Sequence, residues 1–129
     1  MNAVVTIKAR EKMLKARAGE MALPKVVGFV FGDGGTSNGN VVPPTEDQNS
    51  LTNELLRKEI DGYEFTSNLV CRYSCTLEKT ELVGKEISEI ALYDEDGDLV
   101  AIKTCMPKGK DDDLEMVFQI DDSMETEEE

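Results

Sequence analysis

The stretch ALYDEDGDLVAIKT, residues 91–104, sets four acidic side chains and one glycine between two apolar runs. The flanking segments SEIALY and DLVAIKT have the β-branched and apolar content of strands. Between them, DEDG suits a tight turn in which Gly97 adopts a positive φ. We therefore predict an antiparallel hairpin whose acidic side chains face solvent and whose apolar flanks fix the fold.

The same turn has a second interpretation, as a cation site. Asp94, Asp96 and Asp98 alternate as calcium ligands often do. A calcium loop that began at Asp94 would need glycine where Leu99 stands and glutamate where Cys105 stands. We therefore prefer the hairpin, and keep as the alternative a small acidic cation-binding or regulatory module that uses the Asp94 to Asp98 turn.

The composition is that of one acidic domain. Acidic residues outnumber basic ones 27 to 14 in 129 residues, for a formal net charge of −13. This balance opposes binding to nucleic acid or to anionic membranes, so proteins are the expected partners. Acids are concentrated at the C-terminus. We predict one domain over residues 1–120 and a disordered acidic tail over 121–129.

The N-terminus and the cysteines indicate a protein made and kept in a reducing cytosol. Charge begins at Lys8, so we expect neither a signal peptide nor a membrane-spanning segment. Cys71, Cys75 and Cys105 are an odd number at no zinc spacing, and the chain has no histidine. We predict buried free thiols, with no metal and no other cofactor.

No common catalytic arrangement can be read from the chain. Without histidine, a serine or cysteine nucleophile lacks its commonest base. A phosphate-loop interpretation of FGDGGTSNGN fails because Asn40 stands where the lysine would be. We predict that the protein is not an enzyme.

The first half of the chain predicts two helices around a strand and a loop. Residues 6–18, TIKAREKMLKARA, indicate a basic helix with Thr6 as its cap, a thin apolar stripe of Ile7, Leu14 and Ala18, and a stop at Gly19. Its charge favours docking onto an acidic surface of this chain or of a neighbour. Residues 25–35 predict a short buried strand, residues 32–50 a long Gly/Pro loop, and residues 50–60, SLTNELLRKEI, a second helix.

The second half predicts an antiparallel sheet of about four strands. Apolar residues occupy odd positions through YEFTSNLVCRYSCTLEK, residues 63–79, which is long enough to need a bend or a ribbon. The hairpin of residues 84–104 and the alternating segment DLEMVFQI, residues 113–120, complete the sheet. Two helices followed by strands give the predicted fold class, α+β.

Three segments together resemble a known family. VGFVFGDGG at 27–35, SLTNELLRKEI at 50–60 and GKEISEIALYDEDGDLVAI at 84–102 are similar, in that order, to the N-terminal domain of the phage tail-collar fibre family, over about residues 6–120. The resemblance marks fold-determining residues rather than a reaction centre: Gly32, Asp33, Gly34, Asn53, Glu54, Glu89, Leu92, Tyr93, Asp94 and Gly97.

The resemblance implies a structural part of a virion tail, assembled in the cytoplasm of the bacterial host. Members of this family join fibres to a baseplate, so other phage tail or baseplate proteins are the implied partners, and a homo-oligomer is expected. No shaft sequence follows Ile120, which favours a fibre base, a collar or a baseplate adaptor. We expect partner contacts on the basic helix and on the glycine-rich loop: Lys8, Lys12, Lys15, Asp33, Thr36 and Asn38.

Overall fold

The computed structural model describes residues 3–126, and in this range the protein is mostly β. One helix and three antiparallel sheets are present, so the predicted α+β class with two helices is wrong. The elements in chain order are β1 (Val4–Val5), α1 (Ile7–Arg17), β2 (Val26–Gly32), β3 (Thr36–Ser37), β4 (Asn40–Val41), β5 (Glu54–Glu59), β6 (Gly62–Ser67), β7 (Val70–Leu77), β8 (Glu86–Asp94), β9 (Leu99–Gly109) and β10 (Met116–Ser123).

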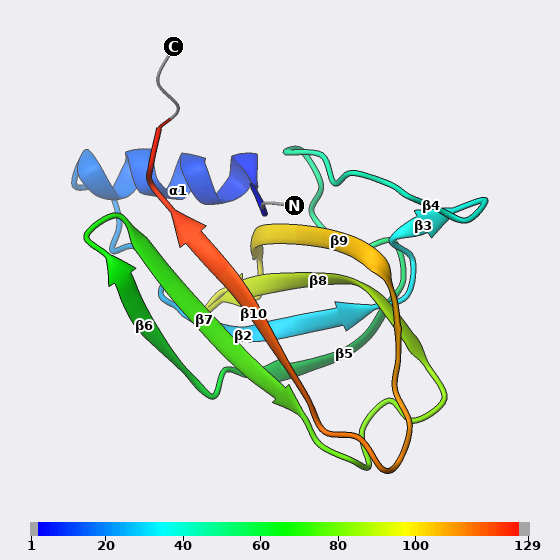
Figure 1. Cartoon of the computed structure of the whole chain (residues 1–129). Helices are drawn as coiled ribbons and strands as arrows, with labels where there is room; N and C mark the ends of the chain where they lie inside the picture. The colour runs from blue at the N-terminus through cyan, green and yellow to red at the C-terminus, as the bar shows by residue number, and fades with distance from the viewer. Residues whose placement is uncertain (1–2, 127–129) are drawn as a thin grey trace.

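Two of the sheets pack against each other around the main core. The five-stranded sheet has the order β1-β9-β8-β2-β5, and the three-stranded sheet has the order β10-β7-β6 (Figure 1). Their facing sides meet in one apolar cluster, in which Phe31 of β2 contacts Phe118 of β10 edge-on at 5.2 Å between ring centroids. Burial of this apolar surface is the main term that holds the two sheets together.

Strand β2 lies inside the five-stranded sheet, between β8 and β5, and is buried on both faces. Phe29 and Phe31 point into the main core, whereas Val30 packs into a second cluster with Leu51 and Ile102 on the opposite face. The sequence of a strand that is buried on both faces is apolar at nearly every position. This is why VVGFVF predicts a buried strand correctly.

The segment predicted as a second helix, residues 50–60, contains strand β5 instead. Strand β5 pairs with the edge of β2. A helix at this place would leave the backbone groups along that edge of β2 unpaired. The register shifts between Phe31 and Gly32, so that Leu55 is an extra residue in β5. The bulge lets the adjacent Leu55 and Leu56 both pack on the core. This breaks the two-residue alternation and produces a spacing that resembles a helix.

The long alternating run of residues 63–79 folds back on itself. It forms the β6–β7 hairpin, in which Tyr63 pairs with Tyr73 and Phe65 pairs with Cys71. Cys71 and Cys75 are buried and Cys105 is partly buried, and all three are free thiols, as predicted. The run therefore supplies two strands, β6 and β7, of the three-stranded sheet.

The predicted long loop contains a short hairpin of its own. Strands β3 and β4 pair through a turn at Asn38 and Gly39, which have φ values of 52° and 80°. Two consecutive positive φ angles at Asn-Gly are those of a type I′ turn. At the other end of the chain, β10 continues to Ser123, so Asp121 and Asp122 of the predicted tail belong to a strand. The last three residues of that tail, 127–129, lie outside the described residues.

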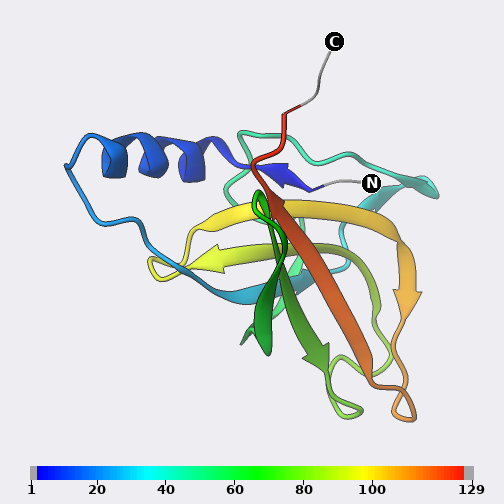
Figure 2. The same cartoon turned by 60° about the vertical axis from the view of Figure 1, so that its left-hand side comes forward.

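The helix lies at one end of the molecule. Figure 2 shows α1 continuing from β1, at the same end as the C-terminal end of β10. Its cap is the predicted one: the Thr6 side chain accepts a hydrogen bond from the backbone N–H of Ala9 at 3.1 Å. The predicted apolar stripe is wrong, because Ile7 and Leu14 are exposed and the buried residues are Ala9 and Lys12.

Candidate functional site: an acidic turn closed by a lysine

The β8–β9 turn has the predicted hairpin form. The backbone N–H of Gly97 donates to the carbonyl of Asp94 at 2.8 Å, and the N–H of Asp94 donates to the carbonyl of Asp98 at 3.0 Å. Gly97 has a φ of 84°. A type I turn followed by a residue in the left-handed region is a common way to connect two antiparallel strands.

The side chain of Lys12 lies at the centre of this turn. Its ammonium donates to one carboxylate oxygen each of Asp94 at 2.8 Å, Asp96 at 3.0 Å and Asp98 at 2.8 Å. Asp94 is only 3% exposed. The prediction that the acids of the turn face solvent is therefore wrong for Asp94, and the basic helix docks on an acidic surface of its own chain.

The ammonium of Lys12 occupies the point where a cation would bind. The three aspartates can each offer an oxygen within 4.8 Å of the others, which is the cluster that the cation hypothesis requires. Burial would lower the pKa of Lys12, but its hydrogen bonds to Asp94, Asp98 and Asp96 outweigh that and raise it. A metal ion would have to displace this ammonium, so the geometry favours an internal ion-pair cluster over the cation-binding alternative.

Thr6 positions the helix that carries Lys12. Its hydroxyl donates to the carbonyl of Leu99 at 2.7 Å and its backbone N–H donates to the carbonyl of Val100 at 2.9 Å. Because Thr6 also caps α1, the first turn of the helix is fixed to β9 directly beside the acidic turn. Ala9 and Lys12 then face the sheets, since residues three apart share a helix face.

A second carboxylate, that of Glu89 in β8, is buried without a cation. It is 1% exposed and accepts hydrogen bonds from the backbone N–H groups of Gly34 at 2.7 Å, Thr52 at 2.8 Å and Asn53 at 2.8 Å. A Cβ atom at Gly32 or Gly34 would lie 2.7 or 2.8 Å from its Oε2. The glycines therefore leave room for the carboxylate, which joins three sequence-distant segments at one point.

Three other motif residues, Glu54, Tyr93 and Gly97, meet around Arg57, which the sequence did not single out. Its guanidinium pairs with Glu54 at 2.9 Å, donates to the carbonyl of Gly97 at 2.9 Å and lies 5.1 Å from the ring centroid of Tyr93. Arg57 was missed because its segment was predicted to be helical, so its partners in the β8–β9 hairpin could not be foreseen. The Glu89 cluster and the Arg57 cluster both hold backbone segments in place.

The predicted partner-binding residues are distributed unequally. Lys12 faces inward and is committed to the acidic turn, while Lys15 is exposed and Lys8 is half-exposed, 4.0 Å from Asp98. Of the loop residues, Asp33 accepts a hydrogen bond from the Asn53 side chain at 2.6 Å. Thr36 and Asn38 lie on the β3–β4 hairpin, where Asn38 is exposed.

The two clusters hold together segments of a domain built from two packed antiparallel sheets. Residues 1–119 match the family described as phage tail-collar fibre protein, N-terminal, and the chain belongs to this family. Comparison with curated proteins and with solved structures found no match. The family indicates a structural component of a phage tail that interacts with other tail proteins. Within residues 3–126, no helix has the length and apolar character to cross a membrane.

Proposed function

We propose that this protein is an attachment part of a phage tail, as a fibre base, a collar or a baseplate adaptor, and that it acts by protein–protein contacts without catalysis. The partner would be another tail or baseplate protein of the virion. Membership of the tail-collar fibre family supports this role. The predicted homo-oligomer would suit fibre symmetry and stays a prediction.

The observation that carries the proposal is the division of the basic helix into two faces. Lys12 is buried, whereas Lys8, Arg10, Lys15 and Arg17 are exposed around the remaining surface of the helix, which we call its outer face. Because the net charge of the whole chain is −13, this helix face is a local exception. It would complement an acidic partner surface and guide its approach.

The β3–β4 hairpin extends this surface. Both β3 and α1 contact β9, and Figure 1 shows the helix and the hairpin toward opposite ends of that strand. The segment that follows β4 is tied to the helix, since the N–H of Ile7 donates to the carbonyl of Glu46 at 2.8 Å and Arg10 pairs with Glu46 at 2.9 Å. We propose that the outer face of α1 and the tip at Asn38 contact the partner together.

Charge reversal on the outer face tests this proposal without removing the helix. The double variant Lys8→Glu, Lys15→Glu should fold normally but reduce incorporation into tail particles at least tenfold, measured by quantitative immunoblotting of purified particles. Lys108→Glu, on an exposed part of β9 far from α1, is the matched control and should incorporate normally. Normal incorporation of the double variant would contradict the proposal.

A further inference from the structure

The inner face of the three-stranded sheet extends beyond the core. Strand register places Tyr63, Tyr73 and Ile120 in one row across β6, β7 and β10, and Phe65, Cys71 and Asp122 in the next row. The first row ends in the core at Ile120. At the other end, Tyr63 is 64% exposed and Phe65 is 69% exposed. The sheet therefore presents a partly uncovered apolar face.

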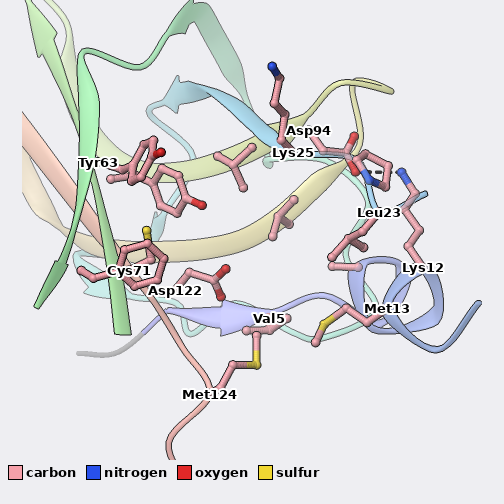
Figure 3. A pocket seen from close by; sticks show the side chains of 16 residues that line it. Val5, Lys12, Met13, Leu23, Lys25, Tyr63, Cys71, Asp94, Asp122 and Met124 are labelled. Carbon is pink, nitrogen blue, oxygen red and sulfur yellow. Dashed lines mark hydrogen bonds and ion pairs between the residues drawn. The ribbon is translucent and has the colours of Figure 1, made fainter. Parts of the chain in front are cut away.

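A groove of about 450 Å³ separates this face from the helix. One wall is formed by the sheet, with Tyr63 and Phe65, and the other by Met13 of α1 and by Leu23, which follows the helix. Figure 3 shows Tyr63, Cys71 and Asp122 on one side and Lys12, Met13 and Leu23 on the other. The volume lies within the range of ligand-binding clefts, roughly 300–1,000 Å³.

Asp122 gives the groove an uncompensated charge. Its Oδ1 is buried and has no hydrogen-bond partner, the one such side-chain atom in residues 3–126. Two lysines line the groove, but Lys12 is held by three aspartates and the amine of Lys25 points away from Asp122 (Figure 3). Desolvation raises the pKa of the Asp122 carboxyl, as expected for an acid without a cation beside it.

We propose that this groove binds a short segment of another tail protein that presents an arginine or lysine to Asp122 and an apolar side chain to Tyr63 and Phe65. A basic side chain would donate to the free Oδ1 and neutralise the carboxylate, while the apolar side chain would cover the exposed rings. The C-terminal end of this chain is a poor occupant because it is strongly acidic. A second copy of the chain is also disfavoured by its net charge of −13.

This inference rests on the proposed role in protein–protein contact, but it uses a different surface. The outer face of α1 and the β3–β4 hairpin do not line the groove. Loss of incorporation in Lys8→Glu, Lys15→Glu would therefore concern that outer surface alone. The two proposals can fail separately.

Photo-crosslinking in assembled tail particles tests the groove. The probe amino acid p-benzoylphenylalanine replaces Phe65, or, as the control, Val117, which is 59% exposed on the other face of the sheet. The proposal predicts that position 65 crosslinks to one segment of a different tail protein, identified by mass spectrometry, and that this segment carries a basic and an apolar residue. Position 117 should not crosslink to that segment.

Binding of the identified segment, made as a synthetic peptide, then tests the role of Asp122. Asp122→Asn keeps the size of the side chain and should weaken peptide binding at least tenfold by fluorescence anisotropy, whereas Val117→Ser should leave it unchanged. A crosslink to a second copy of this chain, no crosslink from position 65, the same crosslink from position 117, or unchanged binding by Asp122→Asn would each overturn the proposal.

Discussion

Asp94 and Asp122 are both shielded acids that line the same groove, but their surroundings are opposite. Asp94 pairs with Lys12, and its Oδ1 accepts the backbone N–H groups of Asp96 at 3.0 Å and Asp98 at 3.1 Å. Asp122 has a buried Oδ1 with no partner. A compensated acid stabilises the fold, whereas an uncompensated one costs stability unless a binding partner supplies the missing group. The difference separates a structural site from a candidate binding site.

Removing the cation from the Asp94 site should have the largest effect. Lys12→Met keeps the length of the side chain but leaves a buried carboxylate without its counter-ion. Breaking a buried pair in this way typically costs about 3–5 kcal/mol of unfolding free energy, and we expect the lower end because Asp96 and Asp98 are partly exposed. Urea denaturation measures the change.

Lys15→Met is the matched control for that variant. It makes the same chemical change on the exposed side of the same helix and should alter stability by less than about 0.5 kcal/mol. Equal losses in the two variants would show that the contacts of Lys12 with the turn do not stabilise the fold.

The two sites should also respond oppositely to pH. The hydrogen bond from Lys12 lowers the pKa of Asp98, so its stabilising contribution is present above the ordinary carboxyl pKa and is lost as the pH falls through the lowered value. Desolvation raises the pKa of Asp122, so its ionisation costs stability as the pH rises through the raised value.

Unfolding free energies between about pH 3 and pH 7 would test this difference in sign. The stability advantage of wild type over Lys12→Met should shrink toward low pH. The advantage of Asp122→Asn over wild type should instead grow toward neutral pH. If the unfolding free energies of wild type and both variants changed with pH in parallel, the opposite roles given to the two sites would be contradicted.

Local turn and cap chemistry allowed some elements to be predicted from the sequence. Thr6 caps α1 and Gly97 permits the β8–β9 turn, because both depend on residues within a few positions. The Asn38-Gly39 turn carried an equally local signal for a hairpin that was assigned to a loop. Its two-residue strands are too short to show an alternating pattern.

The remaining features depend on contacts between distant segments. Lys12 and Asp94 are 82 positions apart, and the sequence cannot say which of five basic residues on the helix faces inward. Strand β5 was predicted as a helix because the bulge at Leu55 breaks its alternation, and only pairing with β2 reveals it. Asp122 was placed in a disordered tail because it lies among acids, although it belongs to a strand.

Unfolding free energies of Asp94→Asn and Asp122→Asn, measured side by side at pH 7, test the central claim most directly. Both substitutions remove one negative charge and keep the size of the side chain. Asp94→Asn should lose about 2 kcal/mol, because the charge-assisted bond from Lys12 is weakened. Asp122→Asn should gain about 1 kcal/mol, because an unpaired buried charge is removed. Changes of the same sign in both variants would contradict the account.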